Sequence, residues 1–209
     1  MRMYEYELSA MGKGYQRIAG CDEVGRGPLA GPLVAAAVVL DPKSRIEGLD
    51  DSKKLSVKKR EALALRIKEE AAAYAVVHIT PSEVDRLNVY KASQTAMRRA
   101  LLKLEGVDYV LSDAMPIPEL GAPVESIIKG DSKSASIAAA SILAKVSRDN
   151  YMMNLAEDYP LYGFDEHKGY PTKNHLEALK AYGVMPEHRK SYAPVRKLIM
   201  KQQTLELGE

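Results

Sequence analysis

Four carboxylates, Asp22, Glu23, Asp113 and Asp131, stand at or near the ends of segments whose composition predicts β-strands. Acidic residues are disfavoured within strands, so acids at several strand ends indicate a converging site that the fold must assemble. Clustered carboxylates raise one another's pKa unless a cation neutralises them, and hard oxygen ligands favour Mg²⁺ or Mn²⁺. Two such ions about 3.5–4 Å apart can activate a water molecule and stabilise a leaving oxygen. The four acids therefore predict metal-dependent chemistry on a phosphate ester, whereas each Asp taken alone could equally be a cap or turn residue.

A glycine-rich turn follows the first two acids, with Gly25, Arg26 and Gly27 in the stretch CDEVGRGPLAGP. Glycine lets main-chain donors and acceptors approach a ligand closely, so this turn and its arginine can position a sugar or a phosphate. Side chains alternate along a strand, so the two adjacent acids reach one site only where the strand bends or ends. The stretch could also be a plain glycine turn or a nucleotide-binding loop. For the latter, the spacing to Gly31 is one residue too long for G-x-G-x-x-G, and no G-K-[ST] follows.

The overall charge does not identify a partner. The net charge of the 209 residues is +2, too weak to imply nucleic acid by itself. Local basic clusters are more suggestive, although each alone is typical of a solvated helix face. These clusters are Lys53, Lys54, Lys58, Lys59 and Arg60; Arg98 and Arg99; and His188, Arg189 and Lys190.

The single cysteine, Cys21, excludes an internal disulfide. No histidine lies near it in the sequence, so we expect a buried strand residue and not a nucleophile. The sequence has no apolar run long enough to span a bilayer, and its N-terminal residues lack the apolar core of a signal peptide. We therefore expect a cytosolic protein, and a monomer because no surplus apolar stripe is evident.

Hydrophobic periodicity predicts a mixed α/β domain. The first two strands are joined by a short glycine-rich link, which predicts an antiparallel hairpin. Residues 1–209 are expected to form one domain, in which residues 160–209 make a helical C-terminal part. The expected strands cover residues 15–23, 31–40, 74–79, 107–113 and 124–131, and the expected helices cover 56–73, with Ser56 as cap, 88–105 and 134–159.

Five long motifs resemble the bacterial ribonuclease HII family in its order and spacing, from about Ile18 to Val195. They are CDEVGRGPLAGP, DDSKKLS, KGDSKSASIAAASILAKVSRD, HKGYPTKNH and GVMPEHRKSYAPV. The resemblance implies a ribonuclease H-like fold, with a five-stranded mixed sheet flanked by helices and a helical C-terminal part. It implies Mg²⁺ or Mn²⁺ as cofactor, with two ions in the catalytic complex. It also implies hydrolysis of RNA in RNA–DNA hybrids and incision 5′ of single ribonucleotides in DNA, leaving 5′-phosphate and 3′-hydroxyl ends.

The resemblance also assigns roles to residues. The family's four metal-site and catalytic acids fall on Asp22, Glu23, Asp113 and Asp131. Its element that reads the ribose 2′-hydroxyl falls on Gly25, Arg26 and Gly27, its phosphate-contacting lysine on Lys53, and its substrate tyrosine on Tyr170. The roles of Ser134 and His167 stay open, and a sliding clamp that binds the C-terminal tail is a further partner to consider.

Two positions depart from the family pattern: Ala114 stands where a glycine is common, and Pro171 follows the tyrosine. Neither position is an acid, so only local loop detail is affected. Two rival hypotheses are a binding module that has lost the chemistry and a relative specialised for long hybrids. The four acids argue against the first, and the intact Gly25-Arg26-Gly27 and Tyr170 argue against the second.

Overall fold

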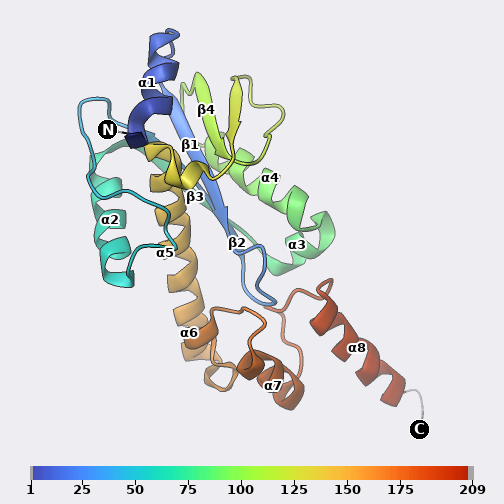
Figure 1. Ribbon diagram of the computed structural model, residues 1–209. Helices are drawn as coiled ribbons and strands as arrows, with labels where there is room; N and C mark the ends of the chain where they lie inside the picture. The colour runs from blue at the N-terminus through green and yellow to red at the C-terminus, as the bar shows by residue number, and fades with distance from the viewer. Residues whose placement is uncertain (1, 207–209) are drawn as a thin grey trace. The chain divides into compact units, whose positions relative to one another are not determined.

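The computed structural model describes residues 2–206 of the chain (Figure 1). Its contacts divide the chain into two compact units. Unit 1 contains residues 1–24, 34–78 and 93–147, and unit 2 contains residues 25–33, 79–92 and 148–209. Each unit has buried hydrophobic clusters of its own, and the expectation of one domain stays a prediction.

Unit 1 is built around a five-stranded sheet with the order β3-β2-β1-β4-β5. β1 runs antiparallel to β2 and parallel to β4, and β4 runs parallel to β5, which confirms the predicted mixed sheet and its leading hairpin. β1 is therefore the central strand. The strands are β1 (Ile18–Val24), β2 (Leu33–Leu40), β3 (Ala71–Ile79), β4 (Tyr109–Asp113) and β5 (Val124–Ile127).

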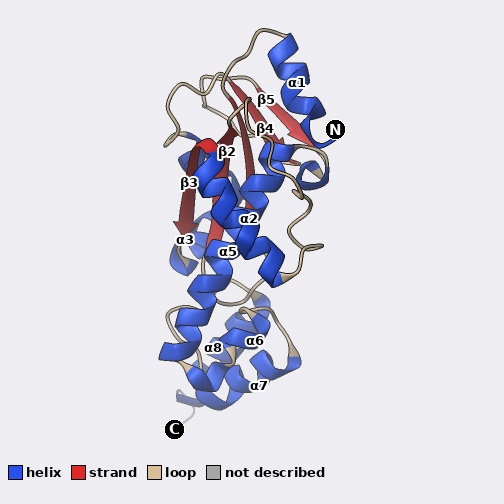
Figure 2. Cartoon of the chain, turned by 90° about the vertical axis from the view of Figure 1, so that its left-hand side faces the viewer, coloured by secondary structure: helices blue, strands red, loops and turns tan. Residues whose placement is uncertain are grey.

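Helices cover both faces of this sheet. Figure 1 shows α2 (Val57–Glu70) and α5 (Ala135–Asp158) on one side and α4 (Val89–Leu101) on the other, and Figure 2 shows the first pair from the front. The apolar IAAASILA stretch of α5 packs with α2 and β2 in one buried cluster, as predicted for a central helix. The predicted cap of α2 is confirmed, since the Ser56 side chain accepts a hydrogen bond from the Lys59 N–H at 3.3 Å.

Unit 2 is mainly helical. It contains α3 (Pro81–Leu87), α6 (Phe164–His167), α7 (Lys173–Tyr182), α8 (Ala193–Glu206) and the 3₁₀ turn η3 (Pro160–Tyr162). One buried cluster joins Ala30, Met152, Tyr162 and Phe164, and a second joins loop 25–33 to α7 and α8. Among residues 2–206, no helix is both long and apolar enough to cross a membrane. The cytosolic location stays a prediction.

The structure corrects several predicted boundaries. Residues 71–73 belong to β3 and not to the preceding helix, because sheet pairing overrides the helix propensity of three alanines. The helix predicted over 88–105 ends at Leu101. The strand predicted over 124–131 ends at Ile127, and Lys129 has φ 57°, which is incompatible with continued strand. A further helix, α1 (Glu5–Gly12), was not predicted.

Candidate active site

Two of the acids lie at the carboxyl ends of neighbouring parallel strands in unit 1. β1 and β4 pair from Ile18 as far as Cys21 and Ser112, so Asp22 and Asp113 directly follow the last pair. β1 still pairs with β2 through Val24. The ladder thus opens on the β4 side only, and the crevice outside the carboxyl ends of such strands is where open α/β sheets bind ligands.

Asp131 reaches the same place from a turn and not from a strand end. The turn η2 (Gly130–Ser132) follows Lys129, and the Gly130 N–H donates to Asp113 Oδ1 at 2.7 Å. A Cβ at Gly130 would lie 2.6 Å from Ile137 Cδ1, so a larger residue there would require the Ile137 side chain to shift. The prediction that this acid ends a strand is wrong, although the turn brings it to Asp113.

Ala114 explains a departure noted in the sequence. Its φ is 50°, in the left-handed region that favours glycine, and its N–H donates to the Ile127 carbonyl at 3.0 Å. The turn after the acid therefore favours glycine, which is why glycine is common at this position in the family.

The acids interact electrostatically. Burial raises the pKa of Asp22 well above its usual range, and the charges of Glu23 and Asp113 raise it further. Burial, and then the charges of Asp113 and Asp51, also raise the pKa of Asp131. Mutual repulsion of this kind is relieved by a cation, because a cation favours the ionised carboxylates.

Glu23 is half-buried at the end of β1. Its backbone N–H donates to Asp22 Oδ1 at 2.7 Å, and it pairs in register with Ala35 of β2. The strand therefore does not end at the two acids on the β2 side, as the alternation of side chains had suggested. The two side chains remain close enough for the charge of Glu23 to raise the pKa of Asp22.

The positively charged side chain of Lys53 interacts electrostatically with these acids. Burial by itself would lower the pKa of Lys53, but the charges of Asp51, Asp131, Asp22 and Asp113 raise it instead. Its N–H donates to Asp51 Oδ1 at 2.9 Å, which fixes the local turn. The charges of three of the four predicted acids thus act on one lysine side chain.

A buried serine pair joins the Lys53 loop to the acid strand. Ser141 of α5 donates a hydrogen bond to Asp22, and its Oγ lies 3.0 Å from the Ser52 Oγ. Arg60 Nη1 donates to the carbonyls of Ser52 at 2.6 Å and Leu55 at 3.1 Å. The sequence analysis did not identify these residues as supports of the site. The only signal in the sequence was a serine within an apolar helix, and a serine and an arginine in or near a loop motif.

The acid set fits a hard divalent cation in its donor chemistry. Its donors are carboxylate oxygens, two of its members have raised pKa values, and Asp22 and Asp131 are buried. Within residues 2–206, no group of three or more His, Cys, Asp or Glu side chains is arranged so that it could hold a metal ion. The structure therefore brings the acids together without a closed cage.

The glycine-rich turn lies in unit 2, where a buried arginine holds it. Arg189 is 0% exposed; its Nε and Nη2 donate to the Gly31 carbonyl at 3.1 and 2.9 Å, and its Nη1 donates to the Arg26 carbonyl at 3.2 Å. The Tyr192 hydroxyl also donates to the Arg26 carbonyl. Four donors from outside the loop thus fix the backbone on which the turn depends.

A second buried arginine joins this loop to Tyr170. Arg148 donates to the carbonyls of Pro32 at 3.0 Å and Ala30 at 3.1 Å, and its guanidinium lies 5.9 Å from the centre of the Tyr170 ring. A cation over an aromatic face is attractive. Arg148 therefore contacts one face of the Tyr170 ring. Tyr170 is 42% exposed, so part of it faces solvent.

The first glycine of the turn is sterically required, and the second lies beside Tyr170. Gly25 has φ 95°, and a Cβ there would lie 2.5 Å from the Arg148 Nε. A Cβ at Gly27 would lie 3.5 Å from the Tyr170 ring, an ordinary van der Waals distance, so the ring lies beside this glycine. The structure thus brings Gly25, Gly27 and Tyr170 together, with Arg26 between the glycines.

A chain of neutral histidines holds the Tyr170 backbone. The Met185 N–H donates to His188 Nδ1 at 3.2 Å, so the proton of His188 lies on Nε2. The two Nε2 atoms of His188 and His175 are 3.2 Å apart, so His175 accepts there and carries its own proton on Nδ1. This proton is donated to the Tyr170 carbonyl at 2.9 Å.

Two residues with open roles have structural partners. The Ser134 hydroxyl caps α5, since it accepts from the Ile137 N–H at 3.3 Å. His167 Nδ1 accepts from the Gly169 N–H at 3.1 Å, and its Nε2 lies 2.7 Å from the Tyr162 carbonyl oxygen. Both are satisfied within the fold.

The chain is similar to known proteins over most of its length. The family model described as Ribonuclease HII matches residues 19–195. A protein of Bacillus cereus (strain AH820), named Ribonuclease HII, is 52% identical over 202 residues, which are 96% of this chain and 78% of that protein. The crystal structure of the ribonuclease H2 from Pyrococcus horikoshii OT3 has a TM-score of 0.77 at 29% identity, and the match covers 90% of this chain and 99% of that one. The ribonuclease in a PCNA:RNase HII complex from Archaeoglobus fulgidus has a TM-score of 0.74 at 28% identity, with 85% and 96% covered.

Proposed function

We propose a substrate and a cut from the premise that this chain belongs to the ribonuclease HII family. The chain is a ribonuclease H, an endonuclease that acts on RNA–DNA hybrids. We further propose that the protein incises duplex DNA on the 5′ side of a single embedded ribonucleotide, leaving a 5′-phosphate and a 3′-hydroxyl. The observation that carries it is the convergence of Asp22, Asp113 and Asp131 where the β1–β4 ladder opens.

Asp22, Glu23, Asp113 and Asp131 are proposed to hold Mg²⁺ or Mn²⁺. Bound there, such ions would activate water and stabilise the leaving oxygen. Ser141 orients Asp22, and the Gly130 N–H orients Asp113, so each acid keeps one oxygen directed by the protein. Lys53 is proposed to contact a substrate phosphate, since it already lies in the field of these acids.

Gly25, Arg26, Gly27 and Tyr170 are proposed to distinguish ribose from deoxyribose. A 2′-hydroxyl is both donor and acceptor, and it is the group that separates RNA from DNA. The buried arginines hold the turn's carbonyls, which supports reading by backbone atoms. The exposed part of the Tyr170 ring supplies a flat apolar surface suited to the deoxyribose that follows the ribonucleotide.

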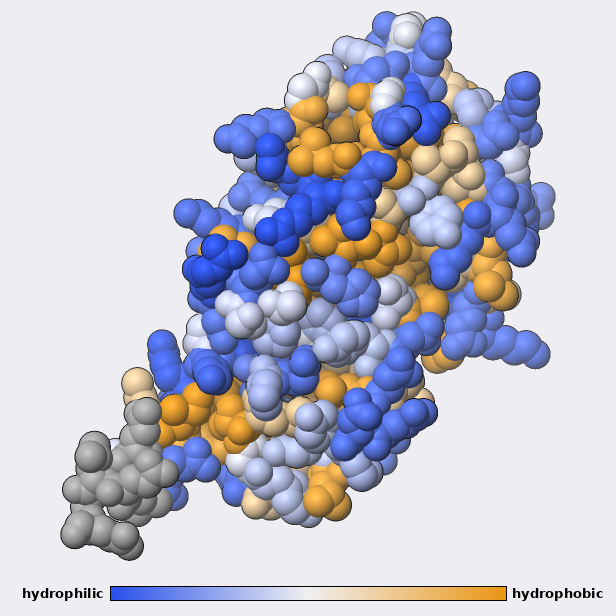
Figure 3. Space-filling view, turned by 180° about the vertical axis from the view of Figure 1, so that it is seen from behind, coloured by the Kyte–Doolittle hydropathy of each residue, from blue (hydrophilic) through white to orange (hydrophobic). Residues whose placement is uncertain are grey.

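Two partner proposals concern the rest of the molecule. The Archaeoglobus fulgidus protein was solved with PCNA, so we propose a sliding-clamp contact through the C-terminal tail of this chain as well. We propose a monomer in solution. On the face drawn in Figure 3, polar side chains separate the apolar groups, which fits a surface exposed to water.

The test is digestion of a labelled duplex that carries one ribonucleotide, with Mg²⁺, with Mn²⁺ and with chelator. The expected result is a single metal-dependent cut on the 5′ side of the ribonucleotide, with end groups mapped by phosphatase and ligase. An all-DNA duplex is the matched control. Cleavage of long hybrids without incision at the single ribonucleotide would favour the hybrid-specialised hypothesis, and binding without any cleavage would favour the non-catalytic one.

A further inference from the structure

α1 contributes a buried carboxylate that lies outside the acid site. Glu7 is only 5% exposed, and its Oε1 accepts three hydrogen bonds from α5 and the residue before it. The donors are the Ser134 Oγ at 2.6 Å, the Ser136 N–H at 2.9 Å and the Ser136 Oγ at 2.6 Å. These residues are distant in sequence, so the contact ties the N-terminal helix to the start of α5.

Glu7 completes the cap of α5. Ser134 satisfies the N–H of Ile137, and Glu7 satisfies the N–H of Ser136, so two of the unpaired donors at the helix start have partners. A negative charge at this end is also favoured by the helix dipole. The first turn of α5 is therefore fixed by a side chain from another helix.

This first turn touches both halves of the acid site. A Cβ at Gly20 would lie 2.2 Å from the Ser136 carbonyl carbon, so β1 is in backbone contact with the turn two residues before Asp22. On the other side, the Ser134 N–H donates to the Gly130 carbonyl at 2.8 Å, immediately before Asp131. A shift of the turn would move the supports of both acids.

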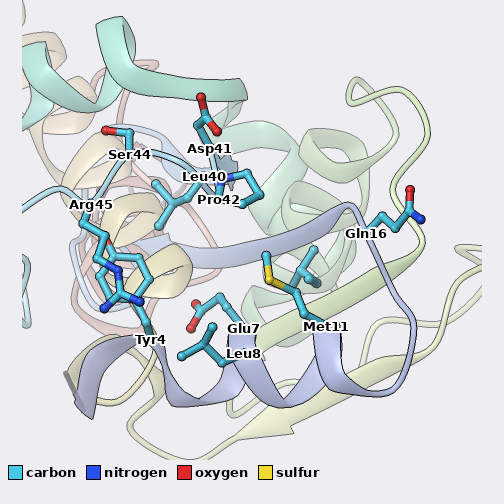
Figure 4. Close-up of a pocket in the computed structure, with 11 residues that line it drawn as sticks. Tyr4, Glu7, Leu8, Met11, Gln16, Leu40, Asp41, Pro42, Ser44 and Arg45 are labelled. Atoms are coloured by element: carbon cyan, nitrogen blue, oxygen red, sulfur yellow. The ribbon is translucent and has the colours of Figure 1, made fainter.

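The packing of α1 leaves a cavity beside Glu7. Figure 4 shows Glu7 projecting from α1 beside a cavity, with Tyr4, Leu8 and Met11 around it. The cavity has a volume of about 50 Å³, and its walls lack the contacts that a filled core would give them. The hydrogen bonds of Glu7 therefore join α1 to the start of α5 beside this cavity.

We propose that Glu7 is a positioning residue for the metal-holding acids, acting through Ser134 and Ser136 on Asp22 and Asp131. This inference rests on the proposed function, because it assigns Glu7 to the support of that site. Glu7 precedes residue 19, where the family match begins, so it lies outside the matched region.

The experiment compares the wild type with Glu7→Ala, Glu7→Gln and Ser136→Ala. Glu5→Ala is the matched control, because Glu5 is exposed on the same helix. Mn²⁺ binding is measured from the electron paramagnetic resonance of the free ion. Substrate affinity without metal, kcat and KM on the single-ribonucleotide duplex, and circular dichroism are measured on the same preparations.

Glu7→Ala is expected to weaken Mn²⁺ binding and lower kcat by about 10-fold or more, the range seen when supports of metal ligands are removed. KM for the duplex and metal-free affinity should stay near wild type. Glu7→Gln keeps an acceptor oxygen and should recover much of the loss. Glu7→Ala combined with Ser136→Ala should be no worse than Glu7→Ala alone, because both remove the same link.

Three results would overturn the proposal. One is wild-type Mn²⁺ binding and kcat in a folded Glu7→Ala protein. Another is a loss of kcat that equals the unfolded fraction measured by circular dichroism, while the folded fraction binds Mn²⁺ with wild-type affinity. If Glu7→Ala does not fold, wild-type Mn²⁺ binding and kcat in Ser136→Ala overturn it instead. Wild type that binds no Mn²⁺ and cuts no duplex would refute the proposed function, which is a separate result.

Discussion

Acidification is expected to destabilise the fold through one pair of rings. Burial, together with the charge of a neighbouring imidazole, lowers the pKa of His175 and of His188 to about 4. The rings share one Nε2–Nε2 hydrogen bond, which requires that one Nε2 carries no proton. A proton added there breaks the chain that ends at the Tyr170 carbonyl.

The magnitude follows from the two pKa values. In the unfolded chain each histidine has a pKa near 6.5, so between about pH 6.5 and pH 4 the unfolded state binds more protons. Stability from these rings is therefore complete above about pH 6.5 and falls as the pH decreases. Between pH 7.5 and pH 5 the loss is about 2 kcal/mol for each ring, or about 4 kcal/mol for the pair.

The assay is urea unfolding at several pH values between 7.5 and 5, with the wild type beside a His175→Gln, His188→Gln protein. The double variant lacks both titrating rings, so it should be less stable at pH 7.5 but should lose about 4 kcal/mol less on acidification. Asp22 and Asp131, whose raised pKa values act in the opposite direction, are present in both proteins and cancel. Parallel losses in the two proteins would refute the reasoning.

Three further predictions concern the site. Asp22→Asn and Asp113→Asn should each nearly abolish cleavage while substrate binding in chelator stays near wild type; near-wild-type cleavage would remove that acid from the mechanism. Tyr170→Ala should slow incision at a lone ribonucleotide more than cleavage of a long hybrid, compared as kcat/KM on both substrates, and equal losses would argue against reading by the ring. Arg189→Lys should lower the free energy of unfolding by about 3 kcal/mol or more. Lysine cannot reproduce the two hydrogen bonds to the Gly31 carbonyl, and charged hydrogen bonds contribute about 1.5–3 kcal/mol each. A loss below about 1 kcal/mol in urea unfolding would contradict this prediction.

The sheet could be predicted because its strands are local and apolar. β2 is buried along almost its whole length, and the glycine-rich link before it indicated the hairpin correctly. Boundaries failed where tertiary contacts decided them. Ala71 begins a strand because the sheet pairs it, and Lys129 ends one because its φ is positive.

The candidate site was likewise predictable from the sequence only in part. The types of Asp22, Asp113 and Asp131 indicated a shared site, but the turn that brings the third acid to the second depends on the fit of Gly130 against Ile137. The residues that support the site were not predictable, because their partners are remote. Glu7 is the clearest case, since a carboxylate on a surface-like helix gives no sequence indication of burial.

Cys21 provides the molecule with a chemical probe of its own. It is the single cysteine, it is completely buried in the central strand, and burial raises its thiol pKa well above the usual range. A thiol reagent can therefore modify it only when β1 separates from its neighbours. The rate of modification in native buffer would report how often the strand beside Asp22 opens, without any label having to be introduced.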